Sequence, residues 1–244
     1  MPASYAGCDR GWQVYPFESG LFMKGVEDGM LESKAKYYKI LADKMIEKLT
    51  LRNMEGYYAA TKEEALQLIK DKFLMDGVSV AWGGSMTMEE IGLMKYLQSG
   101  GSDCVVYDRA TAKTPEEQKA MKANLINADY FIMSTNAITL DGELVNIDGT
   151  ANRVSFLCYG PENVLVIAGM NKVASDVEDA YHRVKNIASP PNAMRLNRNT
   201  PCAKNGRCGD CFSEDCICSQ IVITRRSSAK GRIKVILVGE ELGF

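Results

Sequence analysis

The chain has 244 residues, of which 46% are hydrophobic and 25% charged, and its formal net charge is −2. These values are typical of a globular domain and exclude a disordered or fibrous chain. The near-neutral charge argues against bulk electrostatic binding to nucleic acid. The longest apolar run, residues 164–170, is far shorter than the roughly 20 residues that a membrane-spanning helix needs. Residues 1–10 lack the basic and apolar pattern of a secretory signal, so we expect a cytoplasmic protein.

Taken in chain order, the first half alternates helices and strands. Residues 1–26 carry aromatic side chains without a period and are predicted to form an irregular arm. This arm packs either on its own domain or on a second copy of the chain in a homo-oligomer. Thr61 and Glu64 have the spacing of a capping box, and Thr114-Pro115 is a favoured helix start. The apolar patterns predict helices over 27–53, 61–73, 86–97 and 114–127, and strands over 78–82, 103–108 and 128–133.

The second half is expected to add antiparallel strands. Short turns such as Asp148-Gly149 separate the apolar runs, and turns this short favour hairpins. The prolines at 190–191 are predicted to end the helix before them. The patterns predict a helix over 174–187 and strands over 143–147, 153–159, 164–168, 220–224 and 233–238. We therefore expect one α/β domain over residues 27–244, with a mainly parallel sheet flanked by helices and an antiparallel insertion.

A glycine turn joins the predicted strand 78–82 to the next helix. Gly83 and Gly84 let the backbone approach a ligand closely. Ser85 and the first amide groups of the helix have the chemistry to bind phosphate or carboxylate. The segment lacks the spacing of a P-loop or a dinucleotide-binding motif. It is either a plain turn with a Thr87–Glu90 capping box or an anion-binding turn, and its place at the carboxyl end of a strand favours the second.

Polar residues are also concentrated between residues 134 and 153. Arg153 comes directly before a predicted buried strand, where it either binds an anion from a rigid base or forms a structural ion pair. Glu143 and Asp148 are the carboxylates that would act as acid, base or nucleophile if the protein is an enzyme. For Glu143 a solvated strand position is the simpler interpretation.

Three separate motifs in this order resemble the lactate-utilisation (LUD) domain family over roughly residues 34–239. The first is Trp82-Gly83-Gly84-Ser85 with Thr87, Glu90 and Gly92. The second runs from Asn136-Ala137-Ile138-Thr139 through Asp141-Gly142, Leu144-Val145-Asn146 and Asp148-Gly149 to Asn152-Arg153-Val154. The third is Gly169-x-Asn171-Lys172.

The resemblance implies a fold similar to the sugar-phosphate isomerase and CoA-transferase group (NagB/RpiA-like), a Rossmann-like sheet with an antiparallel portion. It also implies a role in the bacterial oxidation of lactate to pyruvate, beside iron–sulfur oxidoreductase subunits. Fold alone does not establish a function. The positions that match the family define a candidate pocket for a small anionic metabolite: Gly83, Gly84, Ser85, Asn136, Asp148, Asn152, Arg153 and Lys172.

Five of the eight cysteines lie close together in the segment 200–219. Their spacing is Cys202-x5-Cys208-x2-Cys211-x4-Cys216-x-Cys218. Four thiolates would complete a tetrahedral zinc site or hold an iron–sulfur cluster. Reduced thiols without metal and a disulfide or redox switch are the alternatives. The resemblance implies Cys202, Cys208, Cys211 and Cys218 as the ligands, with Cys216 as a spare. The single histidine, His182, excludes a His-rich zinc site.

Three functional hypotheses follow from the sequence. The first is an accessory protein of lactate oxidation that binds a small anionic metabolite, with a metal or iron–sulfur site on the cysteine segment. The second is an enzyme of transferase or isomerase type that uses Glu143 or Asp148. The third is an interaction module whose cysteine segment docks on a partner under redox control.

Overall fold

The computed structural model describes residues 31–100 and 103–244. The predicted arm at 1–26 lies outside these residues. The helices are α1 Glu32–Leu51, α2 Lys62–Phe73, α3 Met86–Glu90, α4 Leu93–Gln98, η1 Arg109–Thr111, α5 Pro115–Ile126, α6 Asn152–Tyr159, η2 Met170–Lys172, α7 Val177–Arg183, η3 Val184–Ala188, α8 Ser189–Arg195 and α9 Pro201–Asn205. The strands are β1 Glu55–Ala59, β2 Ser79–Trp82, β3 Val105–Tyr107, β4 Tyr130–Ser134, β5 Ala137–Thr139, β6 Leu144–Asp148, β7 Asn163–Gly169, β8 Val173–Ala174, β9 Gln220–Thr224 and β10 Ile233–Val238.

The strands form two sheets. The larger sheet has the order β1-β10-β7-β4-β2-β3, and every neighbouring pair in it is parallel. The smaller sheet has the order β8-β5-β6-β9, in which β5–β6 and β6–β9 are antiparallel and β5–β8 is parallel. The predicted α/β class, a mainly parallel sheet with an antiparallel addition, is confirmed.

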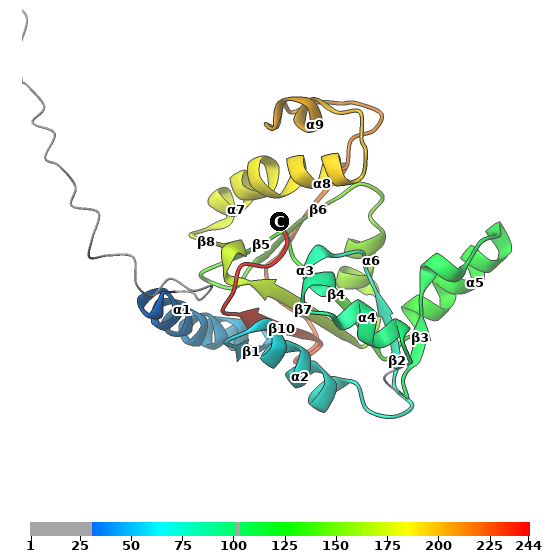
Figure 1. Ribbon diagram of the computed structural model, residues 1–244, viewed down its shortest axis with the longest axis horizontal. Helices are drawn as coiled ribbons and strands as arrows, with labels where there is room; N and C mark the ends of the chain where they lie inside the picture. Colours follow the sequence, from blue (N-terminus) through cyan, green and yellow to red (C-terminus); the bar gives the residue numbers. More distant parts are fainter. Residues whose placement is uncertain (1–30, 101–102) are drawn as a thin grey trace, which may run out of the picture.

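Both faces of the larger sheet are covered by helices, as a parallel sheet requires. Along β7, Val164 and Val166 point to a core that also contains residues of α1, α5 and α6. Leu165 and Ile167 point to the opposite core, shared with α2, α3 and α4. This alternation with a period of two residues places apolar side chains on both faces of the strand. Figure 1 shows α7, α8 and α9 above β5 and β6, on the side away from β10 and β1.

Several helix ends follow from their capping residues. Thr61 accepts a hydrogen bond from Glu64 N at the start of α2. Thr114 forms a full capping box with Glu117 at the start of α5. These local hydrogen bonds satisfy amide groups that a helix leaves unpaired at its N-terminus. The predictions for these two helices are therefore confirmed.

The predicted strand at 153–159 is wrong, because this segment is the helix α6. Val154 and Leu157 are buried three residues apart, which is a helical spacing. Ala151, with a φ of 60°, turns the chain into the helix. Because α6 links β6 to β7, β7 joins the parallel sheet, and the expected hairpin between 153–159 and 164–168 does not form.

Two further boundaries differ from the prediction. The predicted helix 86–97 is divided into α3 and α4 at Gly92, whose φ is 76°. The prolines at 190–191 do not end the preceding helix. The chain passes through the wide turn η3 and continues as α8, whose first positions hold the prolines. Proline is accepted there because its missing amide hydrogen would have no partner in the first turn of a helix.

Candidate functional site

A polar cavity of about 380 Å³ lies at the carboxyl ends of β2, β4 and β6. The carboxyl ends of parallel strands are where open α/β sheets bind ligands. Its lining comes from the glycine turn, the end of β4, the loop before α6, and α8. Of the predicted pocket residues, the structure brings Gly84, Ser85, Asn136, Asp148, Asn152, Arg153 and Lys172 into this lining.

The side chains around the cavity carry mostly positive charge. Within the described residues, one carboxylate side chain, Asp148, lines it together with the cations Arg109, Arg153, Lys172, Arg195 and Arg198. An excess of fixed cations in a concave, partly dry site raises the local concentration of anions. The sequence did not single out Arg109, although it lies only two residues after the carboxyl end of β3. Arg195 and Arg198 reach the cavity only because α8 continues beyond the prolines.

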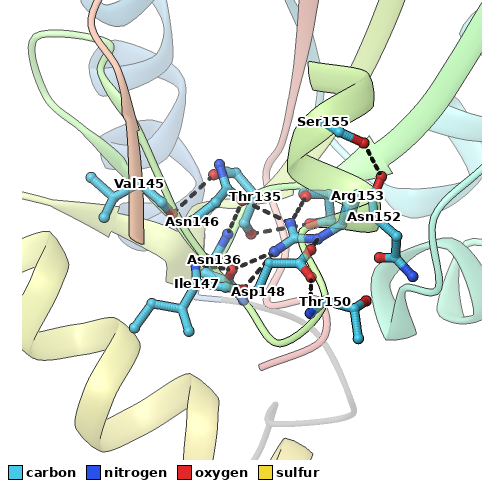
Figure 2. A network of polar contacts seen from close by, with 11 residues as sticks. Thr135, Asn136, Val145, Asn146, Ile147, Asp148, Thr150, Asn152, Arg153 and Ser155 are labelled. Atoms are coloured by element: carbon cyan, nitrogen blue, oxygen red, sulfur yellow. Dashed lines mark hydrogen bonds and ion pairs between the residues drawn. The ribbon is translucent and has the colours of Figure 1, made fainter. Parts of the chain in front are cut away.

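Arg153 is the centre of a hydrogen-bond network (Figure 2). Its Nη1 donates to Ser134 O and to Asn146 Oδ1, both at 2.7 Å. Its Nη2 donates to Asn136 Oδ1 at 2.7 Å and to Ile147 O at 3.0 Å. The guanidinium therefore holds the end of β4 against β6. Burial lowers the pKa of Arg153, while Asp148 partly opposes this shift.

Asp148 completes the network from the cavity side. Its Oδ2 lies 3.6 Å from Arg153 Nε, and its Oδ1 accepts a hydrogen bond from Thr150 N at 3.1 Å. Of the two predicted catalytic carboxylates, Asp148 is the one in the cavity. Glu143 is outside it, where its carboxylate pairs with Arg52 and accepts from Thr139 Oγ1.

The glycine turn makes room for this network. A Cβ on Gly83 would lie 3.1 Å from Arg153 Cγ and 3.4 Å from the ring of Phe131. Gly83 does not line the cavity, but its lack of a side chain leaves the space that the Arg153 side chain occupies. Gly84 lines the cavity beside Arg109, whose Nη2 would lie 3.6 Å from a Cβ on Gly84. Ser85 caps α3 by accepting a hydrogen bond from Met88 N, so the predicted Thr87–Glu90 capping box is not the cap of this helix.

The start of α6 is a second positive feature of the cavity wall. Its N-cap residue, Ala151, has a left-handed backbone and provides no side-chain cap. The first amide groups of the helix therefore lack a capping side chain, and the helix dipole places partial positive charge there. Gly149, Thr150 and Asn152 at this end all line the cavity.

Lys172 is buried at the inner end of the cavity, with 4% of its surface exposed. Its Nζ donates to Phe244 O at 2.9 Å. Burial, followed by the charges of Arg183 and Arg153, lowers the pKa of Lys172 to about 7. The chain segment 240–244, which the sequence analysis did not single out, holds this end of the cavity. There, Gly243 N donates to Glu90 Oε2 at 2.7 Å, and Leu242 N donates to Asn171 Oδ1 at 3.1 Å.

The five clustered cysteines line a second cavity of about 450 Å³. Cys216 Sγ and Cys218 Sγ lie 3.0 Å apart. Burial, together with the neighbouring thiols, raises the pKa of Cys218 to about 12, whereas hydrogen bonds from Ser213 lower that of Cys211. Across residues 31–100 and 103–244, no three His, Cys, Asp or Glu side chains are arranged to hold a metal ion. The metal site at Cys202, Cys208, Cys211 and Cys218 stays a prediction.

The two cavities share a wall. Ile217, between Cys216 and Cys218, lines both of them. Its Cα is 3.3 Å from the position that a Cβ would take on Gly149, in the loop before α6. The cysteine segment therefore packs directly on the polar cavity.

In the described part of the chain, no helix has the length and apolar character needed to cross a membrane. No curated protein has significant sequence similarity to this chain. Among solved structures, a DUF162 family protein from Deinococcus radiodurans is 12% identical, with a TM-score of 0.47, and the match covers 82% of this chain and 98% of that one. Ribose 5-phosphate isomerase from Plasmodium falciparum is 17% identical, with a TM-score of 0.30 over 47% and 52% of the two chains. eIF2B delta from Chaetomium thermophilum is 17% identical, with a TM-score of 0.30 over 60% and 55%.

The family model of the LUD domain matches residues 42–238, which include all three sequence motifs, the cysteine segment and every residue that lines the polar cavity except Phe244. This match covers well over half of the 244 residues. The chain therefore belongs to the LUD domain family, which associates it with lactate utilisation.

Proposed function

We propose that the protein binds a small carboxylate metabolite of lactate oxidation, a hydroxy acid or an oxo acid, in the polar cavity. The observation that carries this proposal is the charge of the lining, in which four arginines and Lys172 face one acidic side chain, Asp148, among the described residues. On this proposal the protein is an accessory component, and the oxidation itself takes place on iron–sulfur partner subunits.

The cations of the cavity differ in what they offer to a ligand. The Nη1 and Nη2 hydrogen bonds of Arg153 go to the protein itself, so it shapes the cavity. Arg109, exposed at the rim, forms no side-chain hydrogen bond or ion pair within the described residues. A planar guanidinium without protein partners can donate two parallel hydrogen bonds to the two oxygens of a carboxylate. We therefore assign the direct contact with the ligand to Arg109. Arg195 at the end of α8 and Arg198 just after it add positive charge to the lining, although Arg195 donates to Asn192 Oδ1 and Arg198 Nη1 lies 3.7 Å from Asp215 Oδ1.

Calorimetry with lactate and pyruvate at low ionic strength tests the proposal. Charge-assisted hydrogen bonds contribute about 1.5–3 kcal/mol, so Arg109→Gln should weaken binding by roughly 10-fold to 100-fold. Arg226→Gln is the matched control, because Arg226 is exposed and does not line the cavity. Absence of binding by both acids to the wild-type protein, or equal affinity of the Arg109→Gln variant, would contradict the proposal.

The enzyme alternative retains one carboxylate, Asp148, because Glu143 is engaged by Arg52 outside the cavity. Asp148→Asn separates the two functions. A transferase or isomerase that uses Asp148 would lose turnover with little change in ligand affinity. For a binding protein, removal of this negative charge should leave the affinity for a carboxylate equal or higher.

A further inference from the structure

Two thiols of the cysteine segment lie in direct contact. Cys216 Sγ and Cys218 Sγ are 3.0 Å apart. A disulfide bond, at ~2.05 Å, is shorter than this contact by about 1 Å. Two thiolates that share one tetrahedral zinc ion, each ~2.3 Å from the metal, would lie about 3.8 Å apart. The two sulfurs are therefore closer than a shared zinc ion would hold them, and a small movement of either side chain brings them to bonding distance.

Other thiols of the segment contact different groups. Cys202 Sγ lies 3.2 Å from Thr200 Oγ1. Cys211 forms hydrogen bonds with Ser213 and also with Cys216, which makes it a competing partner for Cys216. The seven described cysteines are free thiols, so the structure represents the reduced segment.

We propose that Cys216 and Cys218 are a redox-active pair that reacts with small-molecule disulfides of the glutathione class and closes to an intramolecular disulfide. Both thiols are half-buried and line the second cavity, whose volume of about 450 Å³ gives a sulfur of the reagent access to them. Cys218 N donates a hydrogen bond to Cys216 Sγ at 3.4 Å. Because such a bond stabilises a thiolate, which is the nucleophilic form, we assign the first attack to Cys216.

The reaction balances with the small disulfide as the oxidant. The Cys216 thiolate attacks one sulfur of the reagent, a mixed disulfide forms, and the first small thiolate leaves. The Cys218 thiolate then attacks Cys216 Sγ, the internal bond forms, and the second small thiolate leaves. The two protein thiols lose two electrons, and the reagent gains them. The two thiol protons end on the two small thiols that are released.

The new bond would change the wall of the polar cavity, because Ile217 lies between the two cysteines. Ile217 lines both cavities, and its Cα is 3.3 Å from the position of a Cβ on Gly149. Cys218 packs against the apolar cluster that contains Ile147, whose carbonyl oxygen accepts from Arg153 Nη2. These contacts exist in the reduced protein, so closing the bond should loosen the loop before α6 and weaken ligand binding. The effect on affinity rests on the proposed function, whereas formation of the disulfide does not.

Oxidised glutathione tests the pair on the full chain. Protein purified without oxygen is incubated with this reagent, the remaining thiols are alkylated, and the products are digested with trypsin. Cleavage after Arg207 and Arg225 places the four thiols between positions 208 and 218 in one peptide. We expect this peptide to lose two hydrogens, and fragmentation should locate the disulfide between Cys216 and Cys218.

Three variants identify the partners. Cys218→Ser removes the second thiol, so the reaction should stop with one glutathione on Cys216. Cys211→Ser removes the competing partner, and its peptide should lose two hydrogens as the wild-type peptide does. Cys158→Ser is the matched control, because Cys158 is exposed on α6 and lies outside this peptide. It should behave as the wild type.

Hydrogen exchange of residues 147–153, compared between reduced and oxidised protein, measures the effect on the cavity wall without any ligand. We expect faster exchange after oxidation. Calorimetry with pyruvate should show binding that is weaker by about five-fold or more, the lower end of typical coupling between two sites.

Each outcome decides one part of the inference. A disulfide between Cys211 and Cys216, a glutathione adduct that persists on the wild-type pair, or thiols that a bound metal keeps unreactive would overturn the redox pair. A disulfide between Cys216 and Cys218 with unchanged hydrogen exchange would overturn its effect on the cavity. If the reduced protein binds neither pyruvate nor lactate, the proposed function fails, while the peptide map and the hydrogen exchange still decide this inference.

Discussion

Arg153→Lys tests whether the arginine shapes the cavity or only supplies charge. Lysine keeps the positive charge but cannot reproduce a planar fork that donates to four acceptors from two nitrogens. The acceptors are the backbone oxygens of Ser134 and Ile147 and the side-chain oxygens of Asn136 and Asn146. All of them belong to the junction between β4 and β6.

The size of the effect follows from this count. If lysine satisfies two of the four acceptors, two charge-assisted hydrogen bonds are lost, at about 1.5 kcal/mol each or somewhat more. We therefore expect the free energy of unfolding to fall by about 3 kcal/mol. That is a large part of the ~5–15 kcal/mol by which a typical domain is stable.

Urea unfolding followed by circular dichroism measures this difference, with Arg226→Lys as the exposed control, for which we expect a change below about 0.5 kcal/mol. The slope of the transition should be the same in the two variants. A loss below about 1 kcal/mol for Arg153→Lys, combined with unchanged affinity for a carboxylate, would refute the positioning role. In that case Arg153 acts through its charge alone.

Three other predictions concern the same region and the cysteine segment. Gly83→Ala places a methyl group 3.1 Å from Arg153 Cγ, so we expect a loss of about 1–2 kcal/mol in urea unfolding, and an unchanged midpoint would contradict the packing described. The lowered pKa of Lys172 means that the unfolded chain binds more protons between about pH 7 and pH 10. Wild-type stability relative to Lys172→Met should therefore rise across that range, by at most ~1.4 kcal/mol per pH unit, and parallel pH profiles would argue against a buried neutral amine. If the cysteine segment holds a metal, protein purified without oxygen will contain stoichiometric zinc, or iron with sulfide, and Cys208→Ser will lower that content; metal-free wild-type protein would exclude such a site.

The location of the site at the carboxyl edge of a parallel sheet followed from local signals. Alternating apolar runs and helix caps at Thr61 and Thr114 identified most elements, because hydrophobic period and capping act over a few residues. The turn at Gly83-Gly84 pointed, for the same reason, to the edge of the sheet where the polar cavity lies. The family motifs also brought Asn136 and Lys172 into the candidate set, although neither carries a local signal of its own.

The roles of the individual side chains depended on contacts between distant parts of the chain. The apolar run after Arg153 is too short for its period to distinguish strand from helix. The burial of Val154 and Leu157, with Leu157 packed in the core against the sheet, decides it. Glu143 was separated from the cavity by a partner 91 residues away, Arg52. The free energy of these contacts comes from burial and desolvation, which local sequence does not encode.

What the sequence alone determined about this protein is its fold class, its family motifs and the edge of the sheet where they meet. Tertiary structure alone decided that Arg153 is held by protein acceptors, that α8 and the residues after it bring Arg195 and Arg198 into the cavity lining, and that Lys172 is buried near two cations. The physical reason is that propensity and periodicity are set by neighbouring residues. The charge state and availability of a side chain are instead set by the groups that surround it in space.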